Sequence, residues 1–239
     1  MNYLHQVRRT GILLTFFTLS INIPYILLIQ NFEYDDILRE PTDYVLTQFA
    51  AGGTGLILTW FFFGLLTLLF IPAVMLLGKI ILPRDAYYLK IATLMGVISS
   101  VLQSIGLMRW AFVIPLLASL QINPNSNEVT RTAVAVVYQA VHQYGGVIIG
   151  EYLGQTLLIC WTIGMGKAML ESPLFKPWQA WWGLFTTPLL LLGQSELLAT
   201  VIPKMPVIET TPIGFILWEI WLLMIGISLL RIPKQRLIQ

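Results

Sequence analysis

The sequence predicts an all-α integral membrane bundle of six transmembrane helices, with the N-terminus and the C-terminus in the cytoplasm. The composition points to lipid as the solvent, because 56% of the residues are hydrophobic and only 11% are charged. A soluble domain carries roughly 25% charged residues. Six apolar runs, close to or above the roughly twenty residues that cross a bilayer, complete the case. We expect a single polytopic membrane domain over residues 1–239.

The predicted spans follow one another along the chain with short connections. They cover about residues 11–30, 49–77, 91–120, 146–166, 181–198 and 212–230. The second and third are longer than a bilayer requires, so they should tilt or kink. Proline removes a backbone hydrogen bond from a helix. We therefore expect kink points at Pro72 and Pro115, and Pro24 and Pro188 can act in the same way in the first and fifth spans.

The first and last spans differ in how their starts are marked. Arg8 and Arg9 precede the first span as in a signal peptide, but no small-x-small cleavage site follows, so we expect the span to be retained. The sixth span has a clear start, because Thr210 and Thr211 offer hydroxyl caps and Pro212 suits the first helical turn.

Basic residues predict the orientation, because Lys and Arg are retained on the cytoplasmic side. With the N-terminus inside, the inner segments hold ten of the 14 basic residues: Arg8, Arg9, Lys79, Arg84, Lys90, Lys167, Lys176, Arg231, Lys234 and Arg236. The outer segments hold three, Arg39, Arg131 and Lys204, and Arg109 lies within a span. This asymmetry predicts cytoplasmic termini in a plasma (inner) membrane protein.

Several classes of function are disfavoured by what the chain contains. Its net charge of +2, from scattered basic residues, argues against a nucleic-acid partner. The single cysteine, Cys160, excludes internal disulfides and Cys-based metal sites. The two histidines, His5 and His142, are predicted on opposite sides of the membrane and cannot share a metal. With no Walker A loop, zinc motif or serine elbow, we expect no cofactor and no metal, and the sequence favours a protein that is not an enzyme.

Three charged residues interrupt the apolar spans: Arg109 in the third, Glu151 in the fourth and Glu219 in the sixth. A charge in hydrocarbon costs about 2.5–3.5 kcal/mol and usually faces the interior of the bundle. At 1.5 Å per residue, they lie roughly 27, 24 and 18 Å from the inner ends of their helices. All three should share the outer half of the membrane. We predict a cluster in which Arg109 binds Glu151, because an arginine can hold a carboxylate through two parallel hydrogen bonds.

Four polar residues extend this predicted cluster. Gln155 lies one helical turn from Glu151, and Tyr144 lies two turns away in the other direction. Asn22 and Gln103 can contribute from the first and third spans. Two interpretations stay open: a polar pocket open to the outside, and a structural ion pair that holds the helices in register.

The fourth span also carries Gly146, Gly150 and Gly154 at four-residue intervals. Glycines so spaced let another helix backbone approach closely, and we expect this stripe to serve in helix packing. His142 lies half a turn away from Glu151 in angle at 100° per residue. This angle favours an interfacial residue over a ligand of the cluster.

The segment Gly146–Gly154, with Trp161 on the same span, resembles a bacterial family catalogued only as a domain of unknown function. The stretch 218–223 and the opening 9–11 are also similar to it, so the resemblance covers most of the chain. Its most specific part is the Gly-Glu-x-Leu-Gly block that contains Glu151. Members look like six-span membrane proteins. The resemblance implies no catalytic role. It supports only the expectation that Glu151 is important for function.

These observations leave two main classes of function. The first, which we favour, is a carrier, channel-like or binding protein whose outward Arg/Glu cluster holds a small polar or amphipathic ligand. The second is a structural or regulatory subunit of a membrane-protein partner, with an architectural cluster. A weaker third is an intramembrane enzyme that uses Glu151 and Glu219 as a general acid/base pair. In each case the lipid bilayer surrounds the chain.

Overall fold

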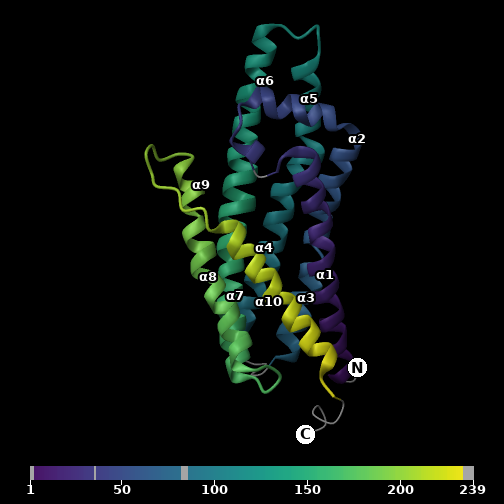
Figure 1. The fold of residues 1–239 in the computed structure, drawn as a ribbon, viewed down its shortest axis with the longest axis vertical. Helices are drawn as coiled ribbons and strands as arrows, with labels where there is room; N and C mark the ends of the chain where they lie inside the picture. Colours follow the sequence, from purple (N-terminus) through teal and green to yellow (C-terminus); the bar gives the residue numbers. More distant parts are fainter. Residues whose placement is uncertain (1–2, 35, 82–85, 234–239) are drawn as a thin grey trace. The chain divides into compact units, whose positions relative to one another are not determined.

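The computed structural model describes residues 3–34, 36–81 and 86–233, and within them every regular element is a helix (Figure 1). In chain order these are α1 (Tyr3–Phe32), a 3-10 turn (Asp36–Arg39), α2 (Thr42–Thr67), α3 (Phe70–Ile80), α4 (Tyr87–Phe112), α5 (Ile114–Ile122), α6 (Glu128–Val141), a π-helical segment (His142–Leu153), α7 (Gly154–Glu171), α8 (Pro177–Gly193), α9 (Ser195–Ala199) and α10 (Thr211–Arg231). Arg84, Lys234 and Arg236, which entered the charge count, lie outside the described residues.

Five of the described helical segments are long and apolar enough to cross a membrane. They are Tyr3–Phe32, Thr42–Ile80, Tyr87–Ile122, Glu128–Glu171 and Thr211–Arg231. They contain the first, second, third, fourth and sixth predicted spans, and each reaches beyond the predicted limits. The chain is therefore a multi-pass membrane protein of the all-α class.

The fifth predicted span, 181–198, differs from the structure. The helix α8 begins earlier, at Pro177, and ends at Gly193, after 17 residues. At 1.5 Å per residue it is about 25 Å long, shorter than the roughly 30 Å of the hydrocarbon core. The polar residues at positions 194–196 end the apolar run, and Leu198 belongs to the short helix α9 instead.

Two prolines mark breaks in the long spans, as predicted. The helix breaks between α2 and α3 at residues 68–69, just before Pro72, and between α4 and α5 at Val113, just before Pro115. A proline ring clashes with the carbonyl of residue i−4, so the distortion falls on the turn that precedes it. Each of these two spans is consequently built from two helices.

The other prolines have different effects. Pro24 and Pro188 lie inside α1 and α8 without dividing them. The Leu184 carbonyl, which cannot receive an N–H from Pro188, accepts a hydrogen bond from the Thr187 hydroxyl at 2.8 Å. At the start of α10 the prediction holds for Pro212 and is wrong for the Thr210 cap. The Thr210 hydroxyl makes no capping bond and donates instead to the Leu189 carbonyl at 2.7 Å.

The chain divides into two compact units. The first holds the described parts of 1–19, 69–101 and 152–239, and the second holds those of 20–68 and 102–151. In the first unit, the Trp161 ring packs against the rings of Trp218 and Trp221, and the centroid of the Phe70 ring lies 4.9 Å from that of Trp161.

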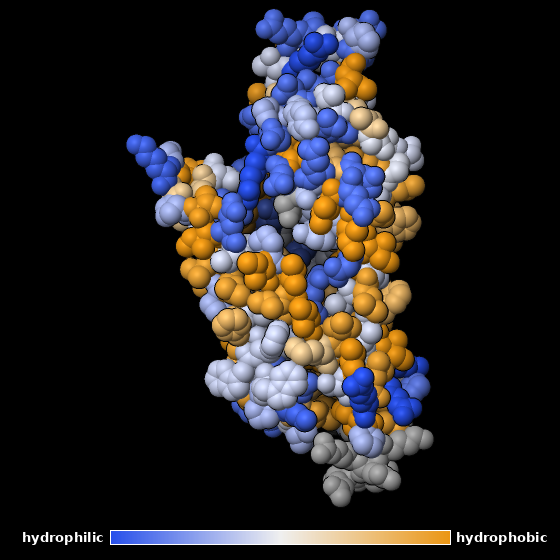
Figure 2. Space-filling view, in the orientation of Figure 1, coloured by the Kyte–Doolittle hydropathy of each residue, from blue (hydrophilic) through white to orange (hydrophobic). Residues whose placement is uncertain are grey.

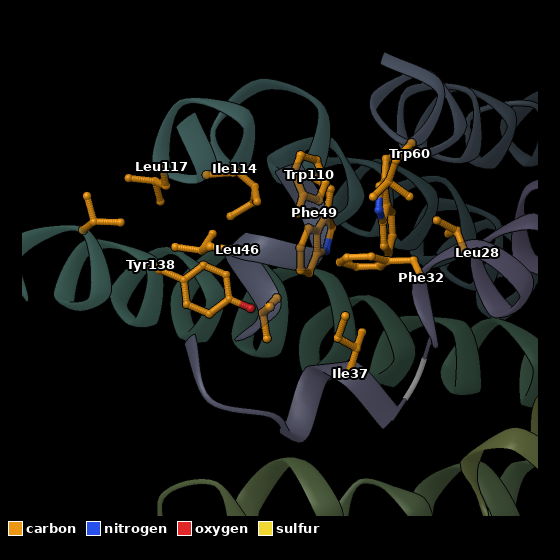
Figure 3. Packing of buried hydrophobic residues seen from close by; sticks show 14 residues of the cluster. Leu28, Phe32, Ile37, Leu46, Phe49, Trp60, Trp110, Ile114, Leu117 and Tyr138 are labelled. Carbon is orange, nitrogen blue, oxygen red and sulfur yellow. The ribbon is translucent and has the colours of Figure 1, made fainter. Parts of the chain in front are cut away.

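The second unit has an aromatic core of its own (Figure 3). The Trp60 and Trp110 rings are stacked with their centroids 4.9 Å apart and their planes at 12°. Phe32 meets Trp110 edge-on at 5.4 Å, and Phe49 stacks on it at 5.7 Å. Aromatic pairs at such distances add to the stability given by burial alone. This core holds the side chain of Trp110 immediately beside Arg109.

The surface has the character expected of a lipid-facing bundle. Large apolar side chains are exposed along α1, including Ile12, Phe16 and Ile23. In the space-filling view, hydrophobic colour covers much of the visible face, and hydrophilic colour gathers at the turn between α5 and α6 (Figure 2). That turn is closed by its own polar groups, as in the bond from the Ser126 hydroxyl to the Leu120 carbonyl at 2.7 Å.

Candidate functional site

Two glycines bring α4 and the π-helical segment into backbone contact. A Cβ atom placed on Gly106 would lie 2.6 Å from the Cα of Gly150, and one placed on Gly150 would lie 2.9 Å from the Cα of Gly106. Both obstacles are backbone atoms, which cannot move aside as a flexible side chain can. In the first unit, the Gly154 carbonyl accepts a hydrogen bond from the Ser99 hydroxyl of α4 at 2.7 Å.

The segment opposite Gly106 has π-helical geometry from His142 to Leu153. Hydrogen bonds in a π-helix run between residues i and i+5, and such segments are rare and frequently occur at functional sites. Gly145, Gly146 and Gly150 reduce the preference of this stretch for α-helix. The segment contains Glu151, whose position is thus set by π rather than α geometry.

Arg109 and Glu151 form an ion pair in this region. The Nη2 atom of Arg109 lies 3.8 Å from Oε1 of Glu151. This separation exceeds hydrogen-bond distance, so the contact is not one arm of the predicted two-bond arrangement. The Nη1 group donates to the Gly106 carbonyl. The guanidinium also packs on Gly146, where a Cβ atom would collide with it.

Arg109 and Glu151 differ strongly in exposure. The arginine side chain is 6% exposed and the glutamate side chain is 38% exposed. The cation is therefore enclosed by protein, and the carboxylate forms the accessible edge of the pair.

Aromatic groups complete the surroundings of the guanidinium. Its Cζ lies 5.3 Å from the centre of the Trp110 ring, within the range of a cation–π interaction. The Tyr138 ring meets Trp110 edge-on with centroids 6.4 Å apart, and the Tyr34 ring meets Trp60 edge-on at 5.2 Å. The ring of His142 stacks on Tyr138, with centroids 5.6 Å apart and planes at 21°.

Two polar atoms in this cluster are buried without a hydrogen-bond partner in the described part of the chain: Nε of Arg109 and Nδ1 of His142. The Nε1 atom of Trp60, in the adjoining aromatic core, is in the same condition. Buried polar atoms are nearly always paired, because leaving one unpaired costs roughly 1–3 kcal/mol. The cluster thus offers one cationic donor and one imidazole nitrogen to a further polar group.

The remaining predicted residues are distributed over both units. Tyr144 is 65% exposed, and Asn22 and Gln103 are half-buried; these three belong to the second unit with Arg109 and Glu151. Gln155 and Glu219 belong to the first unit. There, Gln155 is buried and donates to the Leu190 carbonyl at 3.4 Å, and Glu219 is half-buried in α10.

Sequence reasoning missed His142 as a member of the cluster. An angle of 100° per residue puts His142 and Glu151 on opposite sides of an α-helix, because nine residues make two and a half turns. In a π-helix, where each turn holds more residues, nine residues make about two turns and the two side chains share a face. The closely spaced Gly145, Gly146 and Gly150 were the signal that α geometry fails here.

The chemistry available is that of an ion pair with an imidazole and phenols beside it. No group of three or more His, Cys, Asp or Glu residues that could hold a metal ion occurs within the described ranges. Cys160 is half-buried in α7, in the other unit.

The family described as a domain of unknown function, DUF4386, matches residues 9–226. The match covers most of the 239 residues. The chain belongs to this family. The resemblance inferred from the Gly-Glu-x-Leu-Gly block is thereby confirmed, and the whole Arg109–Glu151 cluster lies inside the DUF4386 match. No curated protein and no solved structure matches the chain. Membership of DUF4386 assigns no ligand and no reaction to the cluster.

Proposed function

We propose that the Arg109–Glu151 cluster binds a small polar or amphipathic ligand, and that the chain acts as a binding or transport protein. The ligand's polar group accepts a hydrogen bond from Arg109 and contacts His142. Its apolar part lies along the lipid-facing surface. Of the other predicted ligand residues, Tyr144, Asn22 and Gln103 belong to the unit that contains this cluster.

This proposal rests on two buried atoms without a hydrogen-bond partner among the described residues, Nε of Arg109 and Nδ1 of His142. They accompany the half-exposed carboxylate of Glu151. A purely architectural ion pair is stabilised by satisfying all its donors, because an unmade hydrogen bond in a low-dielectric interior is costly. Arg109 leaves Nε unsatisfied among the described residues, and His142 leaves Nδ1 unsatisfied there too. A ligand with an acceptor group supplies the missing partner, and Glu151 stands at the accessible edge of the site.

One observation favours the alternative, an architectural cluster in a structural or regulatory subunit. Gly106 and Gly150 bring two backbones into contact, and the guanidinium packs on Gly146 and donates to Gly106. These contacts hold α4 against the π-helical segment without any ligand. Under this alternative, the function lies with a membrane-protein partner.

For the arrangement in the membrane, we propose six spans in a single polytopic domain, with both termini in the cytoplasm of a bacterium and the chain in its plasma membrane. The distribution of basic residues supports this orientation. The exposed aromatic residues Trp178, Trp181 and Trp182 support α8 as the fifth span, because amphipathic rings anchor helices at membrane interfaces.

The experiment is native mass spectrometry of the protein released gently from its own membrane. The proposal predicts a defined extra mass on the wild-type chain that Arg109→Gln loses. Arg131→Gln is the matched control, because Arg131 is an exposed arginine of α6 in the same unit. Each variant is first shown to be folded by its thermal unfolding in detergent.

Other outcomes distinguish the two functions. A bare chain, or one that carries only bulk lipid, would contradict ligand binding and favour the architectural cluster. A second protein in fixed stoichiometry would identify the chain as a subunit. An extra mass retained equally by Arg109→Gln and Arg131→Gln would mean that a ligand binds elsewhere.

A further inference from the structure

A short apolar segment separates α8 from α10. Residues 197–208 run Leu-Leu-Ala-Thr-Val-Ile-Pro-Lys-Met-Pro-Val-Ile, with Gln-Ser-Glu before them and Glu-Thr-Thr after them. Twelve such residues are too few to span a bilayer. Apolar stretches of about 10–14 residues are typical of buried core helices or of interfacial and re-entrant segments. The exposure of this segment decides between these classes.

The segment folds back on itself as a closed hairpin. Its first three residues are the end of α9, and the chain then turns and returns beside this helix (Figure 1). The N–H of Ile208 donates to the Ser195 hydroxyl oxygen at 3.0 Å, which ties the end of the segment to the first residue of α9. At the turn, Met205 N–H donates to the Ile202 carbonyl at 3.3 Å, and Lys204 has a φ of 65°. We call residues 197–208 the α9 hairpin.

The apolar side chains of the α9 hairpin do not form a core. Five of them are exposed: Leu198, Val201, Ile202, Val207 and Ile208, with Val201 at 61%. A buried core segment would cover these groups, so that class is excluded. Contiguous exposed apolar side chains normally mark a surface that contacts a partner or a membrane.

The position of the hairpin next to α10 favours the membrane over a protein partner. The span α10 begins at Thr211 and has 21 residues, about 31 Å at 1.5 Å each. This length matches the roughly 30 Å of the hydrocarbon core, so Thr211 lies near the membrane boundary. Ile208 is three residues away. A membrane boundary at this point puts the hairpin within reach of the bilayer surface.

The neighbouring surface is also apolar. Leu191 and Leu192 are exposed at the end of α8, and Ile213 is exposed at the start of α10. The exposed side chains of the hairpin continue this surface. Its only basic residue, Lys204, lies exposed at the turn, and a lysine can bury its stem among apolar groups while its ammonium group reaches the lipid phosphates.

We propose that the α9 hairpin inserts shallowly into the bilayer, in the leaflet at the N-terminal end of α10, and anchors the short helix α8 there. The helix α8 is shorter than the hydrocarbon core, and the apolar side chains of the hairpin fill the part of the leaflet that α8 does not reach. Lys204 contacts the anionic headgroups. This role is independent of the ligand cluster.

The test places a fluorescent probe on the hairpin of the full chain in lipid nanodiscs. In a Cys160→Ala background, Ile202→Cys is labelled with an environment-sensitive thiol reagent. Asn125→Cys, in the polar turn between α5 and α6, is the control, and Val207→Cys is a second hairpin site in case Ile202→Cys does not fold. Each is exposed to aqueous iodide and, separately, to lipids that carry a nitroxide high on the acyl chain.

The proposal predicts that iodide quenches the hairpin probes several-fold less than the Asn125 probe, and that nitroxide lipid quenches them several-fold more. Equal iodide quenching at all sites would overturn it, because the hairpin would then lie in water. Protection from both quenchers would also overturn it and would show that a second copy or another protein covers the hairpin.

Discussion

Arg109 is a buried cation whose charge is balanced by a carboxylate that lies partly in the open. Its side chain is 6% exposed, and Glu151 at 3.8 Å is 38% exposed. We expect Glu151→Gln to destabilise the protein by about 1–3 kcal/mol, between the values for exposed pairs and for fully buried ones, because Arg109 loses its counter-charge. The thermal midpoint in detergent measures this change.

The matched control is Glu40→Gln, which makes the same change at an exposed glutamate between the first two spans. We expect its midpoint to equal that of the wild type. If Glu151→Gln also leaves the midpoint unchanged, Glu151 does not stabilise the buried arginine.

The Arg109–Glu151 contact was predictable because a charge inside an apolar span requires a partner, and few candidates exist. His142 was not predictable in this way. Its approach to Arg109 depends on π geometry from His142 to Leu153, and a periodicity of 3.6 residues assigns it to the opposite side. The ring contacts of Tyr34 with Trp60 and of Tyr138 with Trp110 likewise depend on tertiary packing, which no local pattern encodes.

The contact between α4 and the π-helical segment depends on the absence of a side chain at Gly106. We expect Gly106→Ala to destabilise the protein by about 1–3 kcal/mol, as overpacking does, because the added Cβ would lie 2.6 Å from the Gly150 Cα. Gly55→Ala is the control, since a Cβ there has nothing within 4 Å. It should be neutral or stabilising by up to about 1 kcal/mol. Equal midpoints for the two variants would contradict the close contact.

A second glycine bends α2. Gly53 has a φ of 54° and a ψ of −149° inside this helix, and the direction of α2 changes along its length (Figure 1). Residues with a side chain are strained there by about 1–3 kcal/mol. We expect Gly53→Ala to lower the unfolding free energy by this amount in detergent, with Gly55→Ala again as the control. An unaltered stability would mean that α2 is straight at this point.

Helix breaks were predictable where one residue dictates them. Pro72 and Pro115 each follow a break by a few residues, because the ring clashes with the preceding turn, whereas Pro24 and Pro188 leave α1 and α8 undivided. The loss of the hydroxyl cap at Thr210 was not predictable, because the Thr210 hydroxyl donates to the Leu189 carbonyl of another helix. Local rules fail wherever a tertiary partner competes.

Hydropathy located five spans but not their full lengths. The segment Glu128–Glu171 has 44 residues, and an α-helix of that size is roughly 66 Å long, twice the hydrocarbon thickness. The part beyond the apolar run is amphipathic helix, whose mixed composition a search for apolar runs does not register. The fifth predicted span, 181–198, extends past the end of α8 at Gly193. Leu197 and Leu198 continue the apolar composition after the polar residues 194–196, so the apolar run is longer than the helix.

The topology of the chain depends on whether α8 crosses the membrane. With six spans and a cytoplasmic N-terminus, a reporter fused after Gln239 should give a cytoplasmic signal, and one inserted within 121–130 should give an external signal. If α8 does not cross, the C-terminal reporter moves to the outside while the other is unchanged. A cytoplasmic signal from 121–130 would contradict the orientation itself.

The ligand proposal and its architectural alternative both require that Arg109 and Glu151 act on each other. A double-mutant cycle tests this, with Arg109→Gln, Glu151→Gln and the double variant compared by unfolding in detergent. We predict that the double variant is less destabilised than the sum of the single variants, with a coupling energy of about 0.5–3 kcal/mol, as for residues in contact. Additive effects, within about 0.5 kcal/mol, would show that the two residues do not interact and would remove the basis of the site.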